Sequence, residues 1–260
     1  MTSIYERFRD SIRSEVPVAL ATLIEGPEVG AKLLIEESGF VLGSLGGPAL
    51  DRVVSRDAIA MLEAGTSEVR HYGPEGEARQ HDLSVFIECH ARRPHLVIFG
   101  AVDFTRALAS QGKLLGFRVT VCDAREVFAT RRRFPMADEV VVDWPDRLLE
   151  RIGSDLGPRD AVCVLTHDAK FDVPAIMGAL PTRVGYLGAM GSRQTHEKRV
   201  ERLLEEGVTS AELERVRSPI GLDIGGRTPE ETAVSIVAEI IALRTGREAP
   251  SLSEGKGSIH

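Results

Sequence analysis

The chain has 260 residues, 43% of them hydrophobic, and a formal net charge of −7 at pH 7. This composition predicts one large or two modest globular domains with a real core, and the negative charge argues against a nucleic-acid-binding surface. The first residues resemble an amphipathic helix rather than a signal peptide, and no apolar stretch approaches the ~20 residues that span a bilayer. We therefore expect a cytoplasmic protein with no membrane partner.

Residues 1–93 predict a small α+β domain. Its expected elements, in chain order, are a helix over 4–14, a strand over 18–24, a hairpin of 32–35 and 40–43, a helix over 50–62 and a strand over 83–89. Between the hairpin and the second helix, Gly46 and Gly47 precede Pro48, which predicts a tight turn with proline opening the helix. The alternative is a loop that approaches a ligand.

After a linker at 91–94, the pattern changes to alternating strands and helices. Short apolar runs predict strands covered on both faces at 96–99, 118–122, 139–142, 161–165 and 183–187. We therefore expect an α/β protein in which residues 94–245 form a Rossmann-like, doubly wound parallel sheet.

The last helix of this second domain has a clear start. Thr228 is a good N-cap, Pro229 suits the first helical position, and Glu231 completes a capping box. Residues 246–260 are rich in glycine, serine, proline and charge, and are expected to be a disordered tail.

Cys89, Cys122 and Cys163 lie inside strand-like runs, which predicts small buried side chains in a reducing compartment. Neither the cysteines nor the histidines show the spacing of metal ligands, so we expect no structural metal. The sequence contains no Gly-x-Ser-x-Gly elbow, no P-loop and no cysteine–histidine arrangement that would identify a catalytic residue.

The first strand-to-helix turn of the second domain contains only part of a dinucleotide fingerprint. Gly100 fits, but Val102 stands where a second glycine would let the backbone approach a pyrophosphate, and Asp103 would repel phosphate. Asp123 ends the next strand, where a ribose-binding acid is expected. The alternative is structural: Gly100 makes the turn, and Asp103 and Asp123 each cap a helix.

A stronger candidate is the loop that contains Gly188 and Gly191. These two glycines follow a predicted strand and precede a helix that opens with the polar residues Ser192 and Arg193. Helix N-termini attract anions through their free N–H groups and the helix dipole, so this loop predicts an anion site. The alternative is a solvated helix face behind a flexible loop.

Two further strand ends add candidate ligand contacts. His167, between Thr166 and Asp168, could touch a ligand or carry a proton, or it could simply be exposed while a neighbour caps the next turn. Gly225 and Arg227 offer backbone N–H groups and a cation, or only a tight turn. Because the carboxyl ends of parallel strands meet at one edge, these loops together predict a site for a small anionic molecule.

These motifs resemble those of the XdhC/CoxI family, accessory proteins of xanthine dehydrogenase and related molybdenum hydroxylases. The resemblance covers residues 16–244 and is most specific at 165–168, 188–196 and 219–230, with 29–32 and 43–47 matching in the first domain. It implies a protein that binds the molybdenum cofactor (molybdopterin), supports its sulfuration and hands it to the apo-hydroxylase. A cysteine desulfurase and a second copy in a homodimer are further partners that it suggests.

Two stretches depart from the family pattern. The family commonly has a cysteine directly after the Gly-Gly of the first-domain turn, where this chain has Pro48, and no cysteine precedes Cys89. The family turn Gly-Ala-Gly-His is replaced by 100–103, Gly-Ala-Val-Asp. Because thiolate is a natural ligand for molybdenum, the first departure removes an expected metal contact. The leading expectation is a non-enzymatic accessory protein that binds the cofactor or its client. The alternatives are an NAD(P)-dependent oxidoreductase and a degenerate relative that binds only protein.

Overall fold

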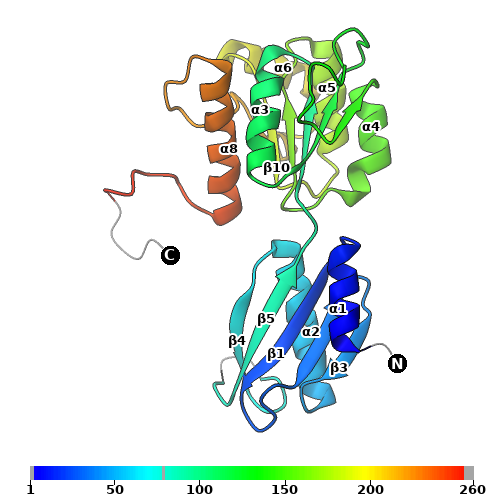
Figure 1. The fold of residues 1–260 in the computed structure, drawn as a ribbon. Helices are drawn as coiled ribbons and strands as arrows, with labels where there is room; N and C mark the ends of the chain where they lie inside the picture. Colours follow the sequence, from blue (N-terminus) through cyan, green and yellow to red (C-terminus); the bar gives the residue numbers. More distant parts are fainter. Residues whose placement is uncertain (1–2, 78–79, 255–260) are drawn as a thin grey trace. The chain divides into compact units, whose positions relative to one another are not determined.

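The computed structural model describes residues 3–77 and 80–254, and the chain forms two compact units, Met1–Arg92 and Arg93–His260 (Figure 1). Each unit has its own hydrophobic core. Among the described residues, no helix is both long enough and apolar enough to cross a membrane. The part of the expected tail beyond residue 254 lies outside the described residues.

The first unit is an antiparallel sheet with helices on both faces. Its strands lie in the order β3-β2-β1-β5-β4. Its elements are α1 (Ile4–Arg13), β1 (Val18–Glu25), β2 (Lys32–Glu36), β3 (Val41–Ser44), α2 (Pro48–Ala64), β4 (Glu68–Tyr72) and β5 (Leu83–His90).

Alternation along the strands points successive side chains to opposite faces of the sheet, and the hydrophobic core of this unit lies on the face covered by α2. The α2 helix packs Leu50, Val54 and Ala58 on the face that carries Leu33 and Ile35. Glu36 points to the opposite face, where its carboxylate accepts two hydrogen bonds from Arg7 of α1, at 2.7 and 2.9 Å. The α+β character expected of this region is therefore present.

The second unit is a six-stranded parallel sheet with helices on both faces. Its elements are β6 (His95–Phe99), α3 (Asp103–Leu114), β7 (Arg118–Cys122), β8 (Glu139–Val141), α4 (Pro145–Ile152), a 3-10 turn (Gly153–Asp155), β9 (Ala161–Val164), α5 (Ala169–Ala179), β10 (Tyr186–Ala189), α6 (Arg193–Glu205), α7 (Ser210–Leu213), β11 (Val216–Arg217) and α8 (Pro229–Thr245).

The strand order, β11-β10-β9-β6-β7-β8, confirms the expected Rossmann-like sheet. The chain starts at β6, runs outward to β8, then returns to β9 on the other side of β6. The topological switch point therefore lies between β6 and β9. Figure 1 shows α3 and α8 side by side on one face and α4 with α5 on the other, in agreement with two separate cores around one sheet.

Several sequence-based assignments need correction. No element is expected between residues 62 and 83, but β4 lies there. Its side chains are exposed up to Tyr72, so it lacks an apolar pattern. The two-residue strand β11 was also missed. Leu114, an apolar residue at the last position of α3, is 81% exposed. Cys89 is only partly buried, whereas Cys122 and Cys163 are fully buried as expected.

The strand expected over residues 183–187 lies three residues further along, at β10. Pairing of β10 with β9 begins only at Tyr186 opposite Ala161, because residues before it run beside the turn that precedes β9. A Cβ on Gly185 would lie 1.9 Å from the carbonyl oxygen of Pro158, which shows how close the two backbones are.

Candidate functional site

The carboxyl edge of the second sheet brings together loops that follow β6, β7, β9, β10 and β11. At its centre, Gly100 follows β6 with φ of +106°, and a Cβ there would lie 2.7 Å from the Thr166 side chain and 3.0 Å from its backbone nitrogen. Gly100 and Thr166, which the sequence placed on separate strand ends, are therefore in contact across the switch point. Open α/β sheets bind ligands in the crevice at this position.

Asp123 follows β7 and is 3% exposed. Its carboxylate accepts hydrogen bonds from the backbone N–H of Ala101 at 2.8 Å, the backbone N–H of Arg125 at 2.9 Å and the Arg125 guanidinium at 2.9 and 2.7 Å. Burial alone would raise the pKa of Asp123, but these donors outweigh it and hold the pKa below its usual value. The carboxylate is thus committed to holding two crevice loops together.

The structural alternative for Asp123 and Asp103 is only partly right. No helix follows Asp123, because residues 123–138 form turns. Val102 occupies the N-cap of α3 and Asp103 its first turn, where the Asp103 side chain is 92% exposed and lies 3.7 Å from Arg133. Asp103 therefore presents a negative charge to solvent at the helix start.

Residues 166–168, in the loop after β9, have different roles. Thr166 is 4% exposed, and its hydroxyl donates to Asp172. Asp168 is the N-cap of α5 and accepts from the backbone N–H of Lys170 at 3.1 Å. His167 is exposed between them. Asp168 thus has the capping role that the alternative interpretation gave it, and His167 remains available at the edge.

The loop after β10 starts later than the sequence suggested. Gly188 lies inside β10 and not in the loop. A Cβ at this position would lie 2.6 Å from the Ile220 side chain and 2.7 Å from the Tyr186 ring, so the strand has room only for glycine here. Gly191, with φ of +144°, makes the turn into α6. Ser192 is the N-cap of α6 and accepts from the Thr195 N–H at 3.1 Å.

Arg193 and the loop before α8 offer exposed cations. Within the described residues, the guanidinium of Arg193, at the first position of α6, makes no hydrogen bond or ion pair. Gly225 has φ of +72° and, with Arg227, belongs to the exposed turn before α8, where Glu231 accepts from the backbone N–H of Arg227 at 2.7 Å and of Thr228 at 3.0 Å. The α8 capping box is present as expected.

Sequence reasoning missed a buried ion pair beneath this edge. Arg199 of α6 and Asp172 of α5 are 4% and 3% exposed, and the guanidinium donates to the Asp172 carboxylate at 2.8 and 3.2 Å. Arg199 also donates to the Met190 carbonyl at 2.6 Å and to the Ser218 hydroxyl at 3.1 Å. The Asp172 carboxylate also accepts a hydrogen bond from the Thr166 hydroxyl, so it connects Arg199 to Thr166.

One guanidinium therefore connects the loops after β9, β10 and β11. The only sequence signal was positional. Arg199 lies four residues before the buried Leu203, on the face of α6 turned to the sheet.

Gly46 and Gly47 lie in the first unit. Gly46 has φ of +119°, Gly47 is the N-cap of α2, and Pro48 holds its first turn, as the structural interpretation expected. No side chain lies within 4 Å of a Cβ built on Gly47. The turn is thus open at this glycine.

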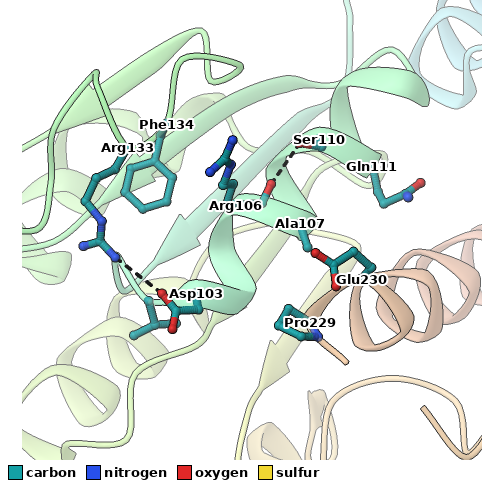
Figure 2. A pocket seen from close by; sticks show the side chains of 10 residues that line it. Asp103, Arg106, Ala107, Ser110, Gln111, Arg133, Phe134, Pro229 and Glu230 are labelled. Atoms are coloured by element: carbon teal, nitrogen blue, oxygen red, sulfur yellow. Dashed lines mark hydrogen bonds and ion pairs between the residues drawn. The ribbon is translucent and has the colours of Figure 1, made fainter. Parts of the chain in front are cut away.

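A pocket of about 430 Å³ lies along α3 and beside the first turn of α8 (Figure 2). It is lined by Val102, Asp103, Arg106, Ala107, Ser110, Gln111, Arg133, Phe134, Pro229 and Glu230. None of the predicted site residues lines it. Within the described residues, no group of three or more histidine, cysteine or acidic side chains could hold a metal ion.

Comparisons with known proteins agree with this architecture. Residues 96–240 match the family model of the XdhC Rossmann domain, and residues 11–73 match that of the XdhC and CoxI family. The chain also resembles a solved structure described as a xanthine dehydrogenase from Bacillus halodurans, with a TM-score of 0.56 and 23% identity over 94% of this chain and 97% of the other. This likeness concerns the fold.

The curated relatives are longer than this chain, which spans less than two thirds of each. An uncharacterized protein of Escherichia coli, YqeB, is 28% identical over 88% of this chain and 44% of its own length. A Bacillus subtilis protein, described as a probable component of xanthine dehydrogenase, is 31% identical over 92% and 64%, respectively. The molybdenum cofactor insertion chaperone PaoD of Escherichia coli is 34% identical over 35% of this chain and 29% of its own.

Proposed function

Because the chain belongs to the XdhC and CoxI family, we propose that it is an accessory protein that binds the molybdenum cofactor and serves the maturation of a molybdenum hydroxylase. The names of two relatives, a probable component of xanthine dehydrogenase and a molybdenum cofactor insertion chaperone, support this role. Its place of action would be the cytoplasm, with a xanthine dehydrogenase-type apo-enzyme as client and a cysteine desulfurase as sulfur donor.

The observation that carries the proposal is the start of α6 at the carboxyl edge of the second sheet, where the Arg193 guanidinium is exposed and, within the described residues, makes no hydrogen bond or ion pair. Ser192 and Arg193 open α6 beside Gly191, and helix N-termini with a nearby guanidinium suit phosphate groups. The cofactor carries such a phosphate. Gly100, Thr166, His167, Gly225 and Arg227 would then border the same ligand.

The three cysteines are poorly suited to bind the metal of the cofactor. Cys122 and Cys163 are fully buried, and burial raises the pKa of both thiols, that of Cys122 to about 12. Cys89 is half-buried, and burial raises its pKa to about 11. Because a metal ligand must be a thiolate, these thiols are poor ligands for molybdenum. Recognition would thus rest on phosphate and pterin contacts.

Titration of the molybdenum cofactor against variants tests this proposal. We expect Arg193→Ala to weaken binding by about tenfold or more, the usual cost of losing a hydrogen bond to a charged group. Arg202→Ala, an exposed cation at the far end of α6, is the matched control. Equal binding by all three proteins would contradict the site assignment.

The NAD(P) alternative predicts a measurable affinity that we do not expect. Val102 has a Cβ at the position of the fingerprint glycine, Asp103 is exposed at the helix start, and Asp123 is occupied by Arg125. Calorimetry should therefore give dissociation constants for NAD(H) and NADP(H) on the order of millimolar, about −4 kcal/mol. A micromolar constant would favour the oxidoreductase.

A further inference from the structure

A row of aromatic and cationic side chains lies beside the switch point. The Trp144 and Phe171 rings have centroids 5.2 Å apart, and the Arg125 guanidinium lies 5.4 Å from the Phe171 centroid and 4.7 Å from that of Phe128. Lys170 adds an ammonium 4.7 Å from the Phe171 centroid. We call Trp144, Phe171, Arg125 and Phe128 the aromatic row.

The aromatic row is drawn from three strand ends at the carboxyl edge. Arg125 and Phe128 follow β7, Trp144 follows β8, and Phe171 lies in the first turns of α5 after β9. Trp144 and Phe128 are each 40% exposed, whereas Phe171 between them is 5% exposed. Two large rings therefore face solvent at the edge where an open α/β sheet binds its ligand.

Hydrogen bonds hold the row in place. The Asp123 carboxylate accepts two hydrogen bonds from the Arg125 guanidinium, at 2.7 and 2.9 Å. The same carboxylate accepts a hydrogen bond from the backbone N–H of Ala101, in the turn after β6. Arg133 joins the carbonyl oxygens of Ala101 and Phe128 at 2.9 and 3.2 Å. The guanidinium plane and the Phe128 loop are thus fixed relative to the crevice before any ligand arrives, which lowers the entropic cost of binding.

We propose that the aromatic row is a stacking surface for a planar bicyclic nitrogen heterocycle of the pterin or purine class. Exposed aromatic rings beside a fixed guanidinium recognise such heterocycles by stacking and cation–π contact. The inference rests on the proposed function in one respect, because the pterin of the bound cofactor would be the heterocycle.

The strand positions also match a ligand with a ring and a phosphate. The β7 strand lies three positions from β10, roughly 14 Å at the usual strand spacing. A heterocycle on the aromatic row would leave its phosphate chain to run past Gly100 toward Ser192 and Arg193. The two ends of the ligand would then be recognised by separate side chains.

Trp144 is the only tryptophan of the chain and reports on this surface directly. We expect 6-hydroxymethylpterin, which carries no phosphate, to quench Trp144 emission saturably in the full-length protein. Phe128→Ala should weaken this binding by about tenfold, as loss of one stacking ring does. Calorimetry on Trp144→Leu should show a similar loss, and thermal unfolding should confirm that both variants fold.

Controls separate this inference from the function it rests on. Leu114→Ala removes a side chain that is 81% exposed at the far end of α3 and should change nothing. Arg193→Ala should leave binding of the bare pterin unchanged. If guanosine binds and the pterin does not, the result supports the stacking surface and contradicts the proposal that the protein binds the molybdenum cofactor. If neither ring gives saturable quenching, or if Phe128→Ala binds as well as the native chain, the aromatic row is only loop packing.

Discussion

Replacing Arg199 with methionine is expected to destabilise the second unit by about 3–5 kcal/mol, the usual cost of leaving one partner of a buried ion pair alone. Methionine approximates the length of the arginine side chain without its charge. The Asp172 carboxylate, 3% exposed, would lose its two guanidinium bonds and keep only the Thr166 hydroxyl. Denaturant unfolding of the native and variant chains measures the difference.

The size of this effect should depend on pH, with a sign set by Asp172. Burial raises the pKa of this carboxyl in the native protein, and donors from Thr166 and Arg199 offset only part of that rise. Without Arg199 the pKa rises further. The folded variant then keeps a proton that the unfolded chain has lost, so its stability falls as pH rises above the usual aspartate value of 3.8. The deficit relative to the native chain should therefore be smallest in acid and grow toward neutral pH.

Two further variants decide what Arg199 does. Arg199→Met combined with Asp172→Leu removes both charges and should recover most of the lost stability, because buried ion pairs are often replaceable by apolar side chains. Arg202→Met removes an exposed arginine of the same helix and should stay within about 0.5 kcal/mol of the native chain. If Arg199→Met were as stable as Arg202→Met, the buried pair would contribute nothing to the stability of the second unit.

The stable double variant also tests positioning. If Arg199 holds the loops after β9, β10 and β11 in register, ligand binding should be weaker in the double variant even though it is folded. This readout separates a role in the geometry of the edge from a role in stability alone.

The parts of the fold that were predictable have local causes. The start of α8 follows from Thr228, Pro229 and Glu231, three neighbours whose hydrogen bonds need no distant partner. The hairpin of β2 and β3 and the helix opened by Pro48 are specified in the same way. The five continuous apolar runs indicated strands covered on both faces, and this pattern alone sufficed for the Rossmann-like sheet.

The features that were not predicted correctly depend on contacts between residues that are far apart in the sequence. The position of β10 is set by pairing with β9, and no pattern within residues 183–189 separates the turn from the strand. The buried ion pair of Arg199 was not predicted, because its partners Asp172, Met190 and Ser218 lie on other elements. The aromatic row was not predicted for the same reason, since its members follow three different strands.

Replacing Gly100 with alanine is expected to be the most damaging single change at the switch point. A φ of +106° is a backbone conformation that costs an L-residue about 1–3 kcal/mol. The added Cβ would also lie 2.7 Å from the Thr166 side chain, 3.0 Å from its backbone nitrogen and 3.2 Å from the Leu165 carbonyl carbon. Overpacking of this kind costs a further ~1–3 kcal/mol. Two of these neighbours are backbone atoms of the loop after β9, so relief requires that loop to move.

Gly116→Ala is the matched control for this prediction. Gly116 has φ of +80°, and nothing lies within 4 Å of its Cβ position, so alanine there adds backbone strain without a collision. The difference in unfolding free energy between Gly100→Ala and Gly116→Ala therefore isolates the close approach of the β6 and β9 loops. Because Thr166 is joined through Asp172 to Arg199, a displaced Thr166 should also weaken ligand binding at the edge, which Gly116→Ala should not do. Equal stability and equal binding in the two variants would mean that the crevice tolerates a wider separation of these loops, and that the contact between Gly100 and Thr166 does not shape the site.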